Sequence, residues 1–291
     1  MWKASLSVMV VMLTSVGLGL AAPAPNPWPE FAVPAPGPAR AIGDYSAGCL
    51  QGAKPLALDG PGYQVMRPSR RRYFGHPDLI DFIRDFGHRV HADRTAPLLI
   101  GDLSQPRGGR AASGHSSHQT GLDVDVWFKS HPRAQRGRLP TPLRETLAAE
   151  SVVDVETQSI VAAERARVAT VLRLVVQDAR VERVFVHPII KRTLCETSGE
   201  SRSWLHKLRP WHGHDDHFHV RLACPAQGAD CQPQAPLPPG DGCDKLAFWF
   251  DVDAQKARQT AKQDYQQSVR QGRGWPDRCN ALLMPQVDEH G

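Results

Sequence analysis

The stretch Leu122-Asp123-Val124-Asp125-Val126-Trp127-Phe128 carries the clearest strand pattern in the chain. Apolar residues alternate in it with Asp123, Asp125 and Trp127. Successive side chains of a strand point to opposite faces of a sheet, so this alternation predicts one face toward the core and one face with both carboxylates.

A second strand is predicted over residues 217–222 by the same alternation. Phe218 and Val220 would point into the core, and His217 and His219 would then project together from the other face. Two imidazoles thus reach one spot while the alternate residues anchor the strand.

The rest of the chain mixes helical and strand patterns without the regular alternation of a βαβ protein. Apolar spacing predicts helices over Pro77 to His91 and Gln158 to Arg180, a short helix over Pro188 to Leu194, and strands at Leu98 to Ile100 and Val184 to Val186. Pro225 to Gly242 is rich in proline and glycine and is predicted to be a loop. We therefore expect an α+β fold with a small antiparallel sheet that carries the metal site, flanked by helices and long disulfide-pinned loops.

Composition excludes several classes of protein. The chain has 291 residues, of which 41% are hydrophobic, so it can bury a core and is not a disordered polymer. Its net charge of +5 is spread out, and the densest basic run, Arg67 to Arg72, has no interleaved aromatic residues. No nucleic-acid partner is expected, whereas an acidic polymer such as a cell wall fits the charge.

The N-terminus has the pattern of an export signal. Lys3 precedes an uncharged, mostly apolar run from Leu6 to Leu20, and small residues around Ala21 fit a signal peptidase site. The alternative is an uncleaved membrane anchor, but the run is short for a spanning helix. We expect residues 1–21 to be a cleaved signal peptide, 22–41 a Pro/Ala-rich leader and 42–291 a single domain, exported to the periplasm without a membrane segment.

The cysteines fit an exported protein. There are six, at positions 49, 195, 224, 231, 243 and 279, and none forms a C-x-x-C pair. Three disulfides are expected in an oxidising compartment. Cys224 and Cys231 are close enough for a local bridge, and Cys49 and Cys279 could tie the two ends of the chain together, but these residues alone leave the pairing open.

The histidines indicate a divalent metal. His118 precedes Asp125 by seven residues, and His217 and His219 lie on the other predicted strand. Two histidines and one carboxylate leave an open position on zinc for water, as in catalytic zinc sites. The alternative, polar surface residues on an edge strand, would explain a lone His-x-His but not the upstream His-x6-Asp on the same kind of face.

These residues are similar to a signature shared by lysostaphin-type peptidases, D-Ala-D-Ala metallopeptidases and hedgehog domains. The longer motifs resemble more narrowly the penicillin-insensitive murein endopeptidase family: Ser113-Gly-His-Ser-Ser-His-Gln-Thr-Gly-Leu-Asp-Val-Asp-Val-Trp127 and Leu208-Arg-Pro-Trp-His-Gly-His-Asp-Asp-His-Phe-His-Val-Arg221. The likeness extends from about Ile42 to Cys279, nearly the whole of the expected mature chain.

The resemblance implies a role for each histidine of the site. His118, Asp125 and His219 would bind zinc, and His115 matches a further site histidine that would be an additional ligand. His217 would be the catalytic base or the partner of the oxyanion.

His214 resembles an additional active-site histidine of the family. The resemblance also implies the disulfides Cys49–Cys279, Cys195–Cys243 and Cys224–Cys231. Some members bind a second metal through an Asp and a His of the middle segment; residues 132–186 contain no histidine here, so the sequence leaves open whether a second metal binds.

The implied activity is zinc-dependent hydrolysis of D-alanyl–meso-diaminopimelate cross-links in peptidoglycan, insensitive to penicillin. Zinc can lower the pKa of water from 15.7 to about 7, which makes an attacking nucleophile available without a serine. The sequence has no G-x-S-x-G motif and no H-E-x-x-H motif. A D,D-carboxypeptidase or dipeptidase of the same group is one alternative, and a non-catalytic wall-binding or metal-binding protein is another. His217 beside three ligands counts against the latter, since a pure binder needs no base there.

Overall fold

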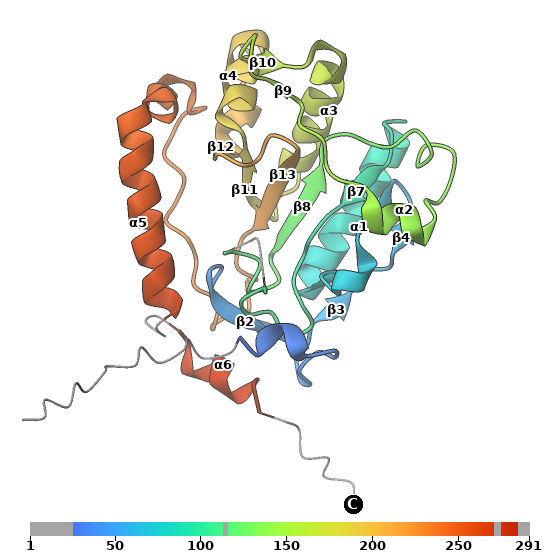
Figure 1. The fold of residues 1–291 in the computed structure, drawn as a ribbon, viewed down its shortest axis with the longest axis vertical. Helices are drawn as coiled ribbons and strands as arrows, with labels where there is room; N and C mark the ends of the chain where they lie inside the picture. The colour runs from blue at the N-terminus through green and yellow to red at the C-terminus, as the bar shows by residue number, and fades with distance from the viewer. Residues whose placement is uncertain (1–25, 113–115, 271–274, 285–291) are drawn as a thin grey trace, which may run out of the picture.

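A mixed sheet of seven strands forms the centre of the molecule (Figure 1). The computed structural model describes residues 26–112, 116–270 and 275–284. The strands lie in the order β12 (Leu208–Pro210), β11 (Val181–Val186), β13 (His217–Leu222), β8 (Asp123–Trp127), β7 (Leu98–Ile100), β5 (Tyr63–Val65) and β4 (Asp59–Gly60). The α+β class is confirmed, and the sheet contains two parallel pairings, β11 with β12 and β5 with β7, besides the antiparallel ones.

Strands β8 and β13 are the central antiparallel pair. His219 lies opposite Asp125, His217 opposite Trp127, and Arg221 opposite Asp123. Cross-strand partners share a face of a sheet. The polar residues of both strands therefore lie on one face, as the alternation in the sequence predicts.

The other face of the sheet packs on helices α1 (Pro77–Ala92) and α3 (Arg165–Val176). Phe218 lies at the centre of this core, fully buried, with its ring 6.4 Å from Phe86 and 5.2 Å from Phe128. Burial of one such ring contributes roughly 2–3 kcal/mol, so the helices hold the strand that carries both histidines.

Helix α1 matches the prediction for Pro77 to His91. Proline is favoured at the first position of a helix, because the backbone N–H that it lacks would have no acceptor within the helix there. The helix predicted from Gln158 to Arg180 is shorter than expected. Ser159 and Ile160 instead form strand β10, which pairs with β9 (Val153–Asp154), and helix α3 begins only at Arg165. Gln158 has a left-handed backbone (φ 51°) and turns this hairpin, which helical periodicity does not reveal.

The remaining elements lie around the sheet. They are η1 (Trp28–Glu30), β1 (Arg40–Asp44), β2 (Ala47–Gln51), β3 (Lys54–Pro55), η2 (Pro68–Arg70), β6 (Phe74–Gly75), α2 (Thr141–Thr146), η3 (Ala162–Glu164), α4 (Pro188–Thr197), η4 (Ser203–Lys207), η5 (Cys243–Lys245), η6 (Ala247–Phe250), α5 (Val252–Arg270) and α6 (Asp277–Ala281). Helix α5 runs along one side of the molecule in Figure 1. Arg258 of this helix lies 4.0 Å from the ring centres of Trp211 and Trp249, which fixes the helix to the segment that leads to β13.

Three disulfides join distant parts of the chain: Cys49–Cys279, Cys195–Cys243 and Cys224–Cys231. All three pairings that the family resemblance implied are confirmed. The first joins β2 to α6, and the other two hold both ends of the predicted loop at 225–242. No helix or strand lies within that loop, so the disulfides replace a packed core there.

Packing of the described chain begins before Ile42. Trp28 is only 4% exposed and lies with its ring 5.5 Å from that of Trp275, beside the Cys49–Cys279 disulfide. The Pro/Ala-rich segment is thus anchored to the domain at Trp28, since a buried indole ring contributes a large apolar area.

Candidate metal centre

Three side chains with metal-ligating atoms meet on the polar face of β8 and β13: His118, Asp125 and His219. One ligand atom from each lies within 4.8 Å of the others, and all three residues are buried. His118 Nε2 lies 3.4 Å from Asp125 Oδ2, and His219 Nδ1 lies 3.2 Å from Asp125 Oδ1. Within the described parts of the chain, no other cluster of three His, Cys, Asp or Glu side chains has this spacing.

His118 reaches the strands from the loop that precedes β8. Its backbone is left-handed (φ 68°), which costs a non-glycine residue about 1–2 kcal/mol. The backbone N–H of His118 donates to Asp123 Oδ2 at 3.2 Å, and its ring centre lies 4.6 Å from that of His219. Such strain persists where the surroundings fix the residue, and it concentrates at functional sites.

Asp123 organises the site from behind. Fully buried, it accepts hydrogen bonds from His219 Nε2 at 2.7 Å and from Arg221 Nε at 2.6 Å. Burial by itself would raise the pKa of Asp123, but Arg221 and His219 outweigh it and hold that pKa well below its usual range. The carboxylate therefore stays ionised and fixes His219 with Nδ1 toward Asp125, as expected of a carboxylate that orients a ligand.

The donor set fits a zinc ion. Imidazole nitrogens suit zinc, copper, iron and nickel, and zinc takes two histidines and one carboxylate in many hydrolytic sites. In His219 the Nε2 atom is engaged by Asp123, so Nδ1 is the nitrogen available to a metal. The three residues together can hold one cation and leave it a coordination position for water or substrate.

His217 flanks this group without belonging to it. Its Nδ1 donates to Asp216 Oδ1 at 2.5 Å, and its Nε2 lies 3.7 Å from Asp125 Oδ1. Burial alone would lower the pKa of His217, but Asp125 and Asp216 raise it to about 9. The ring is thus held in one orientation beside Asp125.

His214 lies next to His217, with ring centres 4.9 Å apart, and 5.9 Å from the ring of His219. Burial, then the neighbouring His219 and His217, lower the pKa of His214 to about 3. Its Nδ1 lies 3.3 Å from the carbonyl oxygens of Trp211 and of His212. Since a carbonyl only accepts, Nδ1 carries the proton, and the neutral ring offers Nε2 as an acceptor.

The other histidines of the sequence are divided between the described and undescribed residues. His115 lies outside the described residues. His76 and His187 cap the starts of α1 and α4 by accepting from the backbone N–H two residues ahead, so both have structural roles. His212 lies between His187 and Trp249, with ring centres at 5.4 Å and 5.8 Å.

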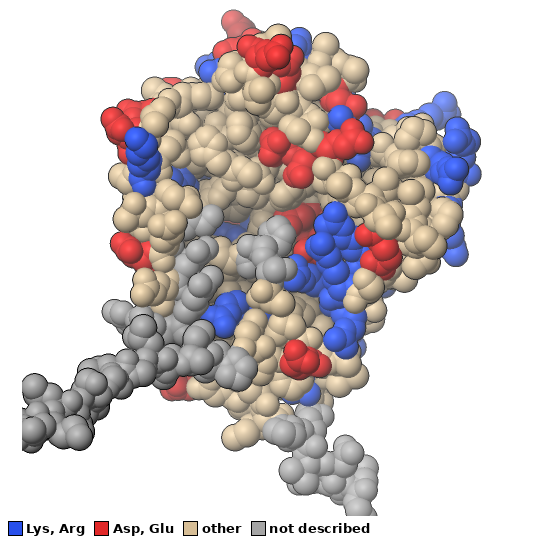
Figure 2. All heavy atoms as spheres, in the orientation of Figure 1, with Lys and Arg blue, Asp and Glu red and all other residues tan. Residues whose placement is uncertain are grey.

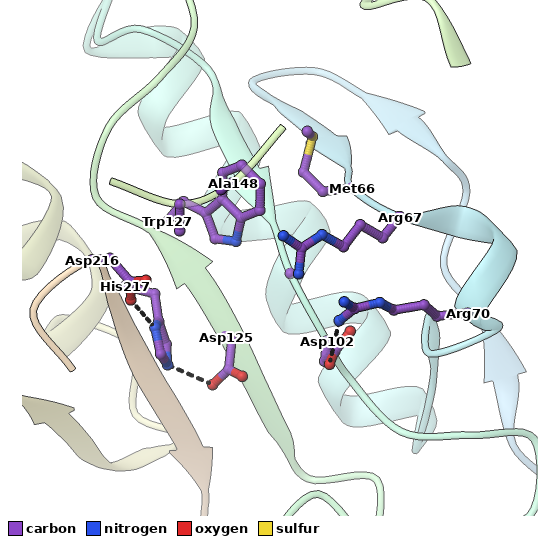
Figure 3. A pocket seen from close by; sticks show the side chains of 11 residues that line it. Met66, Arg67, Arg70, Asp102, Asp125, Trp127, Ala148, Asp216 and His217 are labelled. Carbon is purple, nitrogen blue, oxygen red and sulfur yellow. Dashed lines mark hydrogen bonds and ion pairs between the residues drawn. The ribbon is translucent and has the colours of Figure 1, made fainter. Parts of the chain in front are cut away.

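A pocket of about 210 Å³ opens beside Asp125 and His217. Figure 3 shows Asp125 and His217 on one side of it, Arg67 and Arg70 on the other, and Trp127 between them. The space-filling view shows Lys and Arg side chains gathered beside acidic ones around a hollow on this face (Figure 2). A ligand in the pocket would touch Asp125 and His217 on one side and the two arginines on the other.

Sequence reasoning missed Arg221 and the two arginines of the pocket. Arg221 could have been found, because it continues the period-two pattern of His217 and His219 on the polar face of the strand. Arg67 and Arg70 had no such signal, since they reach the site from a segment far away in the sequence.

No helix among the described residues is long and apolar enough to cross a membrane.

Comparison with known proteins gives a consistent result. The sequence model of a family described as penicillin-insensitive murein endopeptidase matches residues 41–284. A protein of that name from Haemophilus influenzae is 46% identical over 219 residues, which cover 74% of each chain. Those from Yersinia enterocolitica and Klebsiella pneumoniae subsp. pneumoniae are 42% identical over 258 residues (86% of this chain, 87% of the relative) and 44% identical over 219 residues (75% and 79%).

Proposed function

Since the chain belongs to the penicillin-insensitive murein endopeptidase family, we propose that it is a zinc-dependent peptidase that cuts D-alanyl–meso-diaminopimelate cross-links in peptidoglycan. The observation that carries the proposal is the meeting of His118, Asp125 and His219 within 4.8 Å, with Asp125 at the wall of a pocket. Peptidoglycan is the expected partner and Zn²⁺ the expected cofactor.

His118, Asp125 and His219 would hold the metal, with His115 as a further ligand candidate. When bound, zinc would polarise the carbonyl of the scissile amide and make water acidic enough to act as a nucleophile near neutral pH. Asp123 keeps His219 in the orientation that this requires, and a buried, ionised orienting carboxylate also strengthens the imidazole as a donor.

His217 and His214 would handle protons and negative charge at the carbonyl. Asp216 fixes the protonated Nδ1 of His217, so Nε2 faces the side of the pocket where Asp125 lies. When this ring is protonated, Nε2–H can donate to the developing oxyanion. His214 stays neutral and offers Nε2 as a hydrogen-bond acceptor, so the two rings divide the roles of donor and acceptor.

Insensitivity to penicillin follows from these roles. A β-lactam inhibits by acylating a nucleophilic serine. None of the side chains to which we assign a role is a serine, so the drug has no assigned residue to acylate.

The protein would work outside the cytoplasm, where its substrate lies. We propose that residues 1–21 are a cleaved signal peptide and that the mature, single-domain protein acts in the periplasm. The three disulfides support an oxidising compartment.

Digestion of purified cross-linked muropeptide dimers tests the proposed function. The mature protein is incubated with dimers alone, with a chelator, and with a chelator followed by zinc, and products are identified by mass spectrometry. We expect conversion of dimers to monomers that the chelator abolishes, zinc restores and penicillin leaves unchanged.

Other results would favour the alternatives. Release of terminal D-alanine with intact cross-links would indicate a D,D-carboxypeptidase. Intact dimers with zinc-loaded, oxidised protein would indicate a wall-binding or metal-binding protein.

A further inference from the structure

The wall of the pocket opposite Asp125 and His217 is positively charged. Arg67 and Arg70 face the cavity from the segment around η2 (Figure 3). Asp102 is the acidic residue of this wall, and it is shared by two guanidinium groups, from Arg72 at 2.8 Å and from Arg70 at 3.4 Å. This side of the pocket therefore has more cationic than anionic groups.

Arg67 is the arginine whose donors remain available. Among the described residues no carboxylate lies within 4.0 Å of its guanidinium, which donates to the Leu147 carbonyl through Nη2 at 3.2 Å. An arginine has five N–H donors, so most of the fork is open to a ligand. The side chain is nevertheless held in place, because the guanidinium carbon lies 5.7 Å from the centre of the Trp127 ring.

The backbone of Arg67 supports a role in binding. It is left-handed (φ 52°, ψ 51°), a conformation that a non-glycine residue adopts at a cost. Residues held in this way concentrate at ligand sites, where the fixed backbone aims a side chain. Here it aims the guanidinium at Trp127 and the cavity, as Figure 3 shows.

The proposed substrate carries an anion at the corresponding place. In a cross-link between D-alanine and the side-chain amine of meso-diaminopimelate, the carbon next to the amide nitrogen bears a free carboxylate. With the scissile carbonyl beside Asp125 and His217, that carboxylate lies one carbon beyond the leaving nitrogen. Arginine binds a carboxylate with two parallel hydrogen bonds, which fixes orientation as well as charge.

We propose that Arg67, assisted by Arg70, binds the free carboxylate on the leaving-amine side of the cross-link and selects cross-links that carry it. This rests on the proposed endopeptidase function and adds a specificity determinant to it. Both arginines touch substrate in this assignment, and neither takes part in the bond cleavage. A cross-link whose carboxylate is converted to the neutral amide keeps the scissile bond and loses the partner of Arg67.

The test compares two muropeptide dimers that differ only in this group, the free acid and the amide. The wild-type protein is measured with Arg67→Gln, Arg67→Lys and Arg70→Gln. Arg84→Gln is the matched control, because Arg84 lies on the outer side of α1 with 51% of its side chain exposed and pairs with Asp81. Circular dichroism and thermal unfolding of each variant establish that it is folded.

We expect wild type and Arg84→Gln to cleave the free acid with a kcat/KM at least about tenfold above that for the amide. Arg67→Gln should lose most of this preference, because its kcat/KM falls by about tenfold or more on the acid and by a much smaller factor on the amide. The preference for the acid in Arg67→Lys should lie between those of wild type and Arg67→Gln, because lysine keeps the charge but lacks the planar fork. Arg70→Gln should also show an intermediate preference, because Arg70 is already paired in part with Asp102.

Equal cleavage of both dimers by wild type would overturn the carboxylate assignment and leave the endopeptidase function intact. An equal loss on both dimers in Arg67→Gln would overturn it too, since it would show a role in structure only. Failure of wild type on both dimers would overturn the proposed function, and this inference with it. If Arg67→Gln does not fold, the ratio of kcat/KM for the acid to that for the amide is compared in Arg67→Lys and Arg70→Gln. A ratio below that of wild type supports the proposal, and an unchanged ratio overturns it.

Discussion

At the residue scale, the proposed metal ligands and the proposed proton-handling histidines of the candidate centre differ in their hydrogen-bond partners. His219 has one nitrogen on Asp123 and the other toward Asp125, whereas His217 is tied to Asp216 and lies beside the group. The two histidines come from one strand and face the same way, so only their partners distinguish them.

This distinction gives the first prediction. His219→Ala should lose both bound metal and activity, because it removes one of the three proposed ligands. His217→Ala should keep the metal and lose turnover by about 10²–10⁴-fold, the usual contribution of a positioned proton-transfer group. Metal content by mass spectrometry and turnover of muropeptide dimers measure the two effects, and equal metal loss in both variants would contradict the division of roles.

The second prediction concerns Asp123. Asp123→Asn leaves the buried Arg221 without its counter-charge, which should lower the free energy of unfolding by about 3–5 kcal/mol. Zinc affinity should fall by about 10–100-fold because His219 loses its orienting partner. Urea denaturation and competition with a chelator of known affinity measure these changes.

Asp81→Asn serves as the control, since 62% of the Asp81 side chain is exposed and its partner is a surface arginine. It should change neither quantity appreciably. A similar zinc affinity in Asp123→Asn and Asp81→Asn would contradict the orienting role.

The sequence predicts much of the site at this scale, for a physical reason. His217, His219, Asp123 and Asp125 lie on strands, where a period of two determines the face. Arg67 and the αL backbone of His118 depend on how loops cross the sheet, and no local pattern specifies that.

At the element scale, the strand that carries the histidines depends on its buried alternate residues. Phe218 lies between His217 and His219 in the chain and fills the core toward Phe86 and Phe128. The core side chains thereby determine where the polar face places the two histidines.

Phe218→Ala should therefore lower the free energy of unfolding by about 3–5 kcal/mol, through lost burial and the cavity left behind. Phe248→Ala is the matched control, because Phe248 is 46% exposed, and it should change stability by less than about 0.5 kcal/mol. Urea denaturation of both variants provides the comparison, and equal stability of the two would contradict the placement of Phe218 in the core.

Elements with strong periodicity were predictable, and those set by turns were not. The predicted helix from Pro77 matches α1 because a proline start and an apolar stripe indicate the same segment. The start of the helix predicted from Gln158 is wrong, because residues 159 and 160 form a strand of the β9–β10 hairpin. The strands of this hairpin have two residues each, which is too short for a periodic signal.

At the scale of the whole molecule, ion pairs and disulfides join segments that sequence patterns treat separately. Asp178, in the turn between α3 and β11, binds Arg180 through both oxygens at 2.9 Å and 2.8 Å and also Arg89 of α1 at 3.3 Å. Hydrogen bonds from Arg180 lower the pKa of Asp178 to about 2, although partial burial opposes the shift.

The sign of the pH effect follows from this shift. A carboxyl whose pKa is lower in the folded than in the unfolded state stabilises the fold above its unfolded pKa, here 3.8, and this stability is lost as the pH falls toward 2. We expect Asp178→Asn to remove about 1–2 kcal/mol at neutral pH and to flatten the loss of stability between these two values. Urea denaturation over that pH range measures the difference, and an unchanged pH dependence would contradict the role of the pair.

The family resemblance predicted one disulfide pairing that local sequence patterns did not. Spacing suggested Cys224–Cys231 and a link between the chain ends, but Cys195–Cys243 has no local signal, and only the resemblance implied it. Long-range pairing depends on the complete path of the chain, which a single sequence pattern does not describe.

The most direct test of the central claim is the anomalous difference map at the zinc absorption edge from crystals of the zinc-loaded protein. We expect one strong peak coordinated by His118, Asp125 and Nδ1 of His219, with His217 outside the ligand sphere. A peak elsewhere, or zinc bound through His217 in place of His219, would contradict the account.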